Sequence, residues 1–167
     1  MSLGTKEHAE TLRSIAAECE TAVEFGVHEV THYSSTMSLL SGVRVSLDSY
    51  DIKDCPIQVA VEYARRVQKG FRFFVQDVLQ LPAVEADLLY IDTKHTYGQL
   101  SAELSRHGKG VKKYLVFHDT DLCGTRGDDQ SEPGLLQAIV EFLHTAPGWR
   151  LWSHSPESFG LTVLRRG

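Results

Sequence analysis

Two short apolar runs in this chain each end in an acid and an imidazole. Asp92 and His95 follow the run Leu-Leu-Tyr-Ile, and His118 and Asp119 follow the run Tyr-Leu-Val-Phe. Carboxylates and imidazoles are the side chains that bind divalent metals and transfer protons near neutral pH. These four residues are therefore the first candidates for chemistry.

The segment between the two runs has the pattern of one helix. Thr96 and Gln99 have the spacing of a capping box. The helix is predicted to run from Tyr97 to about His107. Two parallel strands joined by a helix bring their carboxyl ends to one edge of a sheet, and open α/β sheets bind ligands at that edge. We therefore expect the four candidate side chains to converge there.

The rest of the chain alternates strand-like runs with helical patterns. Most consecutive strands lie too far apart for hairpins, which predicts right-handed βαβ units and a Rossmann-like, doubly wound α/β sheet, mostly parallel, with helices on both faces. The last two strands are close enough for an antiparallel hairpin. Strands are predicted at residues 21–27, 43–47, 71–75, 87–91, 113–117, 149–153 and 160–164, and helices at 5–18, 31–41, 56–69, 97–107 and 133–146. Two of these helices are expected to have side-chain caps, at Asp54 or Cys55 and at Ser131 or Glu132.

Length, charge and cysteine content limit the class of protein. A chain of 167 residues suits one domain with a sizeable core, in which residues 1–20 form an N-terminal helical segment. A net charge of −5 argues against nucleic acids and anionic membranes as partners, and no apolar run approaches the ~20 residues of a transmembrane helix. Three widely spaced cysteines predict neither a disulfide framework nor a zinc finger, so a cytoplasmic location is the default.

The cluster at the two strand ends permits two kinds of chemistry. Mixed oxygen and nitrogen ligands suit Mg²⁺ or Mn²⁺ if carboxylates dominate, and Zn²⁺ or Fe²⁺ if both imidazoles bind. Alternatively, His95 or His118 acts as a general base that Asp92 or Asp119 orients. The residue types alone do not choose between these roles.

A second set of polar residues follows the earlier strands. Gly26 comes after the first strand, where a glycine lets a ligand approach the backbone and the next helix offers its positive N-terminal end. The dinucleotide fingerprint Gly-x-Gly-x-x-Gly is absent, which argues against a nicotinamide cofactor. Asp48 and Asp51 end the second strand, where an acid commonly binds ribose hydroxyls. Asp77 follows the third strand and could face an adenine amino group.

The other histidines and one polar loop have simpler interpretations. His28 and His32 flank the loop after the first strand and could line a pocket. Residues 121–132 follow the fifth strand directly and are placed to act as a lid. Three histidines are expected on solvated helix faces: His8, His107 and His144.

Taken together, these motifs resemble small class I S-adenosylmethionine-dependent methyltransferase domains, most of all the macrocin O-methyltransferase and cephalosporin hydroxylase-like group. Members of that group typically have Ile-Asp-Gly-x-His-x-Tyr after the fourth strand and Phe-His-Asp-Thr after the fifth. This chain has Ile-Asp-Thr-Lys-His-Thr-Tyr and Phe-His-Asp-Thr at those places. The resemblance extends from about Thr21 to Arg166.

The resemblance implies a cofactor site for S-adenosylmethionine. Glu24 and Gly26 would border the methionine part, Asp51 would hold the ribose hydroxyls, and Asp77 would face the adenine. The loop after Gly26 departs from the family pattern, because Val30 and His32 stand near the places of a second glycine and a serine.

The resemblance also implies roles for the strand-end cluster. Asp92 and Asp119 match positions that bind a divalent metal, Mg²⁺ or Mn²⁺, in metal-dependent members, with His118 as a further candidate ligand. His95 and His118 would act as a ligand, a base or a substrate contact. Thr93 replaces the glycine that usually follows the first of these acids.

Three functional hypotheses follow. The leading one is a metal-assisted O-methyltransferase that acts on a small hydroxylated molecule of the sugar or natural-product type. The second is a metal-dependent hydrolase that uses the Asp92, His95, His118 and Asp119 cluster, and it gains if the loop after Gly26 fills the cofactor pocket. The third is a non-catalytic, methyltransferase-like binding module. The expected partner is a small-molecule substrate, with no nucleic acid or membrane, and assembly into a homo-oligomer is left open.

Overall fold

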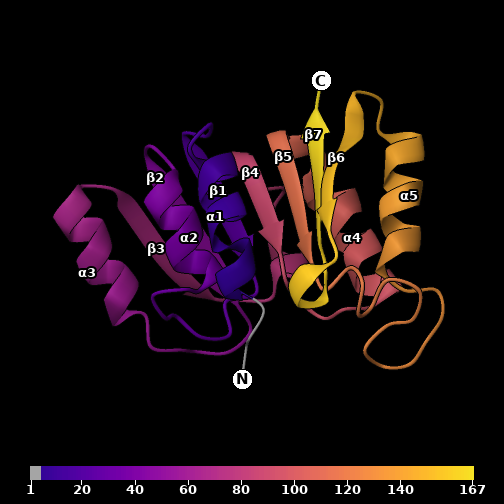
Figure 1. Ribbon diagram of the computed structural model, residues 1–167, viewed down its shortest axis with the longest axis horizontal. Coiled ribbons are helices and arrows are strands. Elements are labelled where there is room, and N and C mark those ends of the chain that lie inside the picture. The colour runs from indigo at the N-terminus through magenta and orange to yellow at the C-terminus, as the bar shows by residue number, and fades with distance from the viewer. Residues whose placement is uncertain (1–4) are drawn as a thin grey trace.

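The computed structural model describes residues 5–167, which include one sheet of seven strands (Figure 1). The order across the sheet is β3-β2-β1-β4-β5-β7-β6. Strands β1 to β5 pair in parallel, whereas β7 runs antiparallel to both β5 and β6. This confirms the predicted fold class and its antiparallel terminal strand. The strands are β1 (Thr21–Phe25), β2 (Ser46–Asp51), β3 (Gly70–Val75), β4 (Ala86–Ile91), β5 (Val111–His118), β6 (Trp149–Ser155) and β7 (Leu161–Arg166).

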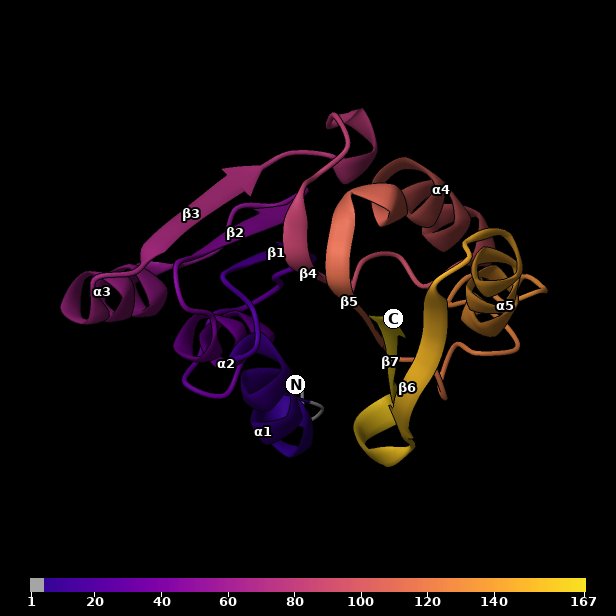
Figure 2. The same cartoon turned by 90° about the horizontal axis from the view of Figure 1, so that it is seen from above.

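Helices cover both faces of the sheet. Figure 2 shows α1, α2 and α3 on one face, and α4 and α5 on the other. None of the described helices is long and apolar enough to cross a bilayer. The α-helices are α1 (Thr5–Ala16), α2 (Ser35–Gly42), α3 (Gln58–Val67), α4 (Tyr97–His107) and α5 (Leu135–Thr145), and the short 3₁₀ turns are η1 (Val78–Gln80), η2 (Gly108–Gly110) and η3 (Glu157–Phe159).

The central strand β4 is buried along its whole length and contributes side chains to two hydrophobic cores. Leu88 and Tyr90 belong to the core beneath α1 and α2, and Leu89 and Ile91 belong to the core beneath α4 and α5. Successive side chains of a strand point to opposite faces, so a run that is apolar throughout is what a doubly covered strand requires. The strand ends at Ile91, so Asp92 and Thr93 lie at its carboxyl end and are only partly buried.

Strand β2 lies three residues later than predicted. The prediction at residues 43–47 followed the valines, but the strand contains Asp48 and Ser49, which look like turn residues. Ser49 is buried, and its hydroxyl is satisfied because it donates to Glu24 of β1 at 2.6 Å. Asp48 pairs with Arg72 of β3. Cross-strand polar pairs thus replace the apolar alternation on which the prediction depended.

Two predicted helix caps are wrong. Helix α3 begins after Ile57 and α5 begins after Gly134, and neither N-cap residue makes a side-chain hydrogen bond. Ser131 instead donates to Asp129 at 2.5 Å, and Glu132 pairs with the Arg126 guanidinium. These side chains are used inside the loop and are not available to the helix. The predicted cap of α4 is present, because Thr96 Oγ1 accepts from the N–H of Gln99 at 3.4 Å.

Two of the three histidines expected in solvent are buried. His107 lies on the apolar face of α4, where Nε2 donates to the carbonyl of Val78 at 3.0 Å and Nδ1 accepts from the N–H of Val84 at 3.3 Å. Burial lowers the pKa of His107, so its neutral form ties α4 to the connection between β3 and β4. His8 lies on the inner face of α1 with its ring 5.5 Å from that of His118. His144 is exposed, as predicted.

Candidate active site

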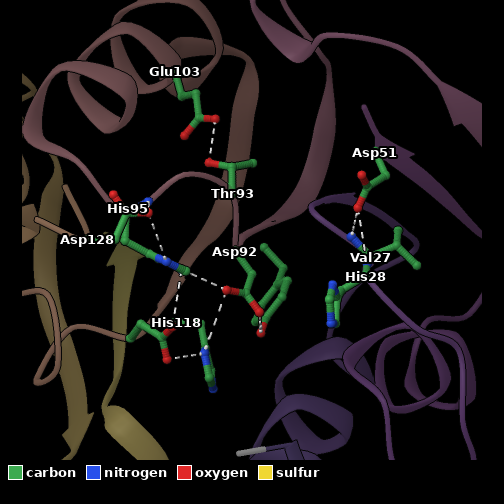
Figure 3. Close-up of polar contacts among 11 residues, drawn as sticks. Val27, His28, Asp51, Asp92, Thr93, His95, Glu103, His118 and Asp128 are labelled. Carbon is green, nitrogen blue, oxygen red and sulfur yellow. Dashed lines mark hydrogen bonds and ion pairs between the residues drawn. The ribbon is translucent and has the colours of Figure 1, made fainter. Parts of the chain in front are cut away.

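The ends of β4 and β5 place four titratable side chains together (Figure 3). Asp92 Oδ1 lies 3.0 Å from His95 Nε2, and the same nitrogen lies 3.3 Å from Asp119 Oδ2. His118 Nδ1 lies 2.8 Å from Asp119 Oδ1 and 3.7 Å from Asp92 Oδ1. The structure therefore brings together the side chains whose convergence was inferred from strand connectivity.

Three members of this cluster fit a divalent cation. Asp92, His118 and Asp119 each offer a ligand atom, and the three atoms lie within 4.8 Å of one another. His118 Nε2 is buried and has no hydrogen-bond partner among the described residues, whereas His118 Nδ1 and Asp119 Oδ1, also buried, lie 2.8 Å apart without ideal hydrogen-bond geometry. Buried polar atoms are nearly always satisfied, and a cation held by Asp92, Asp119 and one nitrogen of His118 would satisfy the atoms that it contacts.

The cluster carries an excess of negative charge that favours cations. Burial lowers the pKa of His95, but the carboxylates of Asp92 and Asp119 outweigh it and raise the pKa. Burial likewise lowers the pKa of His118, but the same two carboxylates outweigh burial, so the pKa is raised. In addition, Asp119 adopts a left-handed φ of 57°, a strained conformation of the kind often found at functional sites. The cluster thus favours positive charge, on an imidazole or on a bound ion.

The loop at residues 121–132, expected to act as a lid, contacts His95 through the main chain. The N–H of His95 donates to Asp128 Oδ2 at 3.2 Å, and the N–H of Asp128 donates to the carbonyl of His95 at 3.0 Å. The loop therefore holds the backbone of His95 in place.

Sequence reasoning missed a buried acid behind the cluster. Glu103 of α4 is fully buried, and its Oε1 accepts from Thr93 at 2.7 Å and from Gln99 at 2.8 Å. Burial raises the pKa of Glu103 to about 7, against the lowering effect of the two donors. The sequence contained one signal of this burial, because Glu103 lies on the same apolar face of the predicted helix as Leu100 and Leu104. Glu103 anchors the turn that leads from β4 to His95.

Gly26 is required by the protein backbone itself. Its φ is 84°, and an added Cβ would lie 1.9 Å from the carbonyl oxygen of Asp92. The N–H of Asp92 in turn donates to the carbonyl of Phe25 at 2.8 Å. The close approach thus comes from the end of β4, whereas the sequence interpretation assigned it to a ligand.

Asp51 organises the loop that follows Gly26. Its Oδ2 accepts from the N–H groups of Val27 and His28 at 2.8 and 3.0 Å, and its Oδ1 accepts from the N–H of Lys53 at 2.9 Å (Figure 3). Burial raises the pKa of Asp51, but these backbone donors outweigh it and lower the pKa. The carboxylate is therefore charged and faces the same edge of the sheet as the cluster.

Bulky residues in this loop do not fill the space above the sheet. Val27 and Val30 are buried in the core under α1 and α2, and Ser34 caps α2 by accepting from the N–H of Met37 at 3.4 Å. Of the two histidines in question, His28 lines the cavity described next, and His32 is not among its lining residues. Val30 therefore turns into the core and His32 is exposed to solvent, while Val27, although buried, still lines the cavity.

One open cavity of about 900 Å³ runs along the carboxyl edge of the sheet. Asp51 and Asp77 line it beside β2 and β3, and Asp92, His118 and Asp119 line it beside β4 and β5. Drug-sized ligands occupy cavities of ~300–1,000 Å³. The cavity is therefore large enough for a nucleoside-sized molecule together with a small second ligand.

Glu24 lies outside this cavity, beneath its floor. Its carboxylate is fully buried and accepts from Ser35 at 2.6 Å, Thr36 at 2.9 Å and Ser49 at 2.6 Å. Burial raises the pKa of Glu24 to about 7, although the three hydroxyls lower it. Glu24 thus joins the start of α2 to β1 and β2, and Ser35 of this network lines the cavity.

Comparisons with known proteins agree with this architecture. No protein-family model matches the sequence, and no curated protein matches it significantly. Among solved structures, a protein from Corynebacterium glutamicum is 19% identical over 97% of this chain and 81% of its own, with a TM-score of 0.70. The N-methyltransferase NodS from Bradyrhizobium japonicum WM9 is 14% identical over 96% of this chain and 94% of its own, with a TM-score of 0.62.

Structures that contain S-adenosylhomocysteine are also similar to this chain. The Podospora anserina methyltransferase PaMTH1, bound to S-adenosylhomocysteine, is 17% identical over 96% of this chain and 78% of its own, with a TM-score of 0.56. NodS has likewise been solved with S-adenosylhomocysteine. At these identities the likeness establishes the fold, so the chain has the Rossmann-like fold of methyltransferases.

Proposed function

We propose that the protein transfers a methyl group from S-adenosylmethionine to a hydroxyl of a small molecule, assisted by Mg²⁺ or Mn²⁺. The observation that supports this most is the single cavity that joins Asp51 and Asp77 to the Asp92, His118 and Asp119 cluster. One end offers acids at the ends of β2 and β3, where nucleoside groups bind in sheets of this kind. The other end offers a metal-binding and proton-accepting group.

The end of the cavity beside β2 and β3, where the cofactor would bind, has both hydrogen-bond acceptors and hydrogen-bond donors in its lining. Asp51 is charged and faces the cavity, and Asp77 lies beyond it at the end of β3. Ser34 and Ser35, at the start of α2, line the same space. S-adenosylmethionine, when bound, supplies a sulfonium-activated methyl group and leaves as S-adenosylhomocysteine. The acidic lining suits a positively charged sulfonium.

The cluster supplies a base and a cation site. A divalent cation held by Asp92, His118 and Asp119 would lower the pKa of an acceptor hydroxyl. His95 Nε2 lies 3.0 and 3.3 Å from two carboxylates, so this nitrogen carries a proton and donates to them. In the neutral imidazole Nδ1 is then the nitrogen that can accept the hydroxyl proton, and the carboxylates stabilise the imidazolium that results. The cavity lining would have to hold the acceptor oxygen close to the methyl group, and such positioning would contribute to the rate.

The hydrolase hypothesis would gain support if the loop from Glu24 to His32 filled the cofactor pocket. Val27 and Val30 of this loop are buried and the cavity is open, so this observation does not favour a hydrolase. The binding-module hypothesis also requires an open cavity, so only a measurement of catalytic turnover distinguishes it from the enzyme hypothesis.

Calorimetry with S-adenosylhomocysteine tests the cofactor half. We expect binding by the wild type and a loss of at least ~10-fold in affinity for Asp51→Ala, which loses the carboxylate that holds the loop and faces the cavity. Asp54→Ala is a matched control, because Asp54 is an exposed acid near the same loop and does not line the cavity. Methyl transfer from labelled S-adenosylmethionine, with Mn²⁺ or with chelator, then tests the chemistry. No binding of S-adenosylhomocysteine in any metal condition would refute the proposal.

A further inference from the structure

The tip of the hairpin between β6 and β7 has an unusual backbone. Three consecutive residues, Ser158, Phe159 and Gly160, have φ values of 45°, 72° and 97°. Left-handed φ is uncommon for residues other than glycine, and it is a genuine outlier for a bulky side chain such as phenylalanine. Such strain persists only where the surrounding structure over-determines it. The question is what holds this tip and what it presents.

The tip is held by the turn that follows Asp119. The N–H groups of Asp121 and Leu122 both donate to the carbonyl of Phe159, at 2.8 and 3.1 Å. Asp121 Oδ2 also lies 3.0 Å from His154 Nε2, which ties the turn to β6. A Cβ at Gly160 would lie 2.4 Å from the backbone nitrogen of Asp121. The position of Phe159 is therefore coupled to the turn that carries a candidate metal ligand.

The Phe159 ring lines the cavity and does not belong to either core. Its relative exposure is 48%, and it lines the same cavity as His95, His118 and Asp119. Tyr50 also lines the cavity, but it lies on β2 and stacks on Phe74. Phe159 is thus the aromatic side chain that the last quarter of the described chain contributes to the cavity. The main-chain hydrogen bonds hold the backbone of Phe159, and the exposed half of its side chain is an apolar surface that a ligand in the cavity can contact.

We infer that Phe159 recognises the acceptor by packing against an aromatic ring, so that the acceptor is a phenol, with its hydroxyl toward the His95 cluster. This inference rests on the proposed function, because it places the acceptor opposite the cofactor end. Aromatic pairs gain energy from offset or edge-to-face contact beyond the area they bury. An open-chain polyol presents no such face. The rigid tip holds the ring in place before binding, which limits the loss of side-chain freedom on association.

Binding of catechol, glycerol and methyl glucoside to the wild type, Phe159→Ala, Phe159→Tyr and Leu122→Ala tests the inference. Leu122 is a matched control, because its side chain is 60% exposed in the adjoining turn and does not line the cavity. Affinities are measured by titration with Mn²⁺, with and without S-adenosylhomocysteine. We expect Phe159→Ala to weaken catechol binding by about tenfold. Phe159→Tyr and Leu122→Ala should bind catechol as the wild type does.

The outcomes separate this inference from the proposed function. The inference would be supported if Phe159→Ala bound S-adenosylhomocysteine as the wild type does and had a raised Kd for catechol but not for glycerol. Equal catechol affinity in the wild type and Phe159→Ala, or no catechol binding by the wild type, would overturn it. Preference for methyl glucoside with the same dependence on Phe159 would also overturn it, in favour of a sugar acceptor. Failure of the wild type to bind S-adenosylhomocysteine would refute the proposed function, and the catechol titration without cofactor would still decide the role of Phe159.

Discussion

Replacing Glu24 by glutamine should remove a pH dependence of stability that burial creates. The carboxylate is fully buried and accepts from three hydroxyls. Burial raises its pKa from the ordinary 4.5 to about 7. Below the lower value the group is protonated in the folded and the unfolded protein alike. Between the two values only the unfolded chain ionises, so the folded state binds more protons and the free energy of unfolding falls as pH rises.

The size of the effect follows from the two pKa values. A difference of one pKa unit is worth about 1.4 kcal/mol, so the interval from 4.5 to about 7 corresponds to a loss of about 3 kcal/mol that is complete above the folded pKa. Glutamine has the shape of the protonated acid and does not ionise. The difference in unfolding free energy between Glu24→Gln and the wild type should therefore change by about 3 kcal/mol between about pH 4 and about pH 8.

Urea unfolding at several pH values measures this difference directly. Glu103 has a similarly raised pKa, but it is present in both proteins and cancels in the comparison. Glu62→Gln is the matched control, since Glu62 is exposed on α3 and its variant should run parallel to the wild type. Parallel curves for Glu24→Gln and the wild type would refute the reasoning. They would mean that the three hydroxyls, and not burial, set the charge of Glu24.

Three further predictions concern other parts of the site and the fold. Gly26→Ala should destabilise the protein by ~3 kcal/mol or more in thermal or urea unfolding, because its φ is 84° and its Cβ would lie 1.9 Å from the carbonyl oxygen of Asp92; an alanine variant as stable as the wild type would contradict this. Asp119→Asn should lower Mn²⁺ affinity at least ~10-fold by calorimetry or electron paramagnetic resonance, whereas equal affinity would place the ion elsewhere. Burial lowers the pKa of His107, so below the ordinary histidine pKa the unfolded chain binds more protons at this residue, and the contribution of His107 to stability falls as pH falls, opposite in sign to the contributions of Glu24 and Glu103; the unfolding free energy of His107→Gln relative to the wild type should therefore rise as pH falls through this range, and a difference that does not change with pH would contradict the lowered pKa.

The convergence of the strand-end cluster could be predicted because it depends on connectivity. An apolar run, a capped helix and a second apolar run define a βαβ unit whatever the exact boundaries are. Asp92 and Asp119 follow such runs directly, so a boundary error of one or two residues would not separate them. The structure brings their carboxylates to the same imidazole, with His95 Nε2 at 3.0 and 3.3 Å.

The errors have a common physical cause, which is that polar residues are buried with partners far away in the sequence. His107 bonds to the connection between β3 and β4, Ser49 bonds to Glu24 across the sheet, and Glu103 bonds back to Thr93. Periodicity counts each of these as a solvated or turn residue, because the partner that offsets its burial is not local. Phe159 was missed for another reason, since its role depends on a left-handed backbone that no local pattern indicates.

The loop after β1 shows why a degenerate motif is compatible with an open cavity. The one glycine that remains, Gly26, is the residue whose Cβ would collide with Asp92, so it is required whether or not a ligand binds. Val30, near the place where the methyltransferase pattern that the sequence resembles has a second glycine, turns into the core. The loop is held from the other side by Asp51, which accepts from two of its N–H groups. The two halves of the cavity therefore depend on a contact between the ends of β1 and β4. A substitution at Gly26 should disturb the Asp51 end and the Asp92 and Asp119 end of the cavity together, whereas a change at Val30 should affect stability alone.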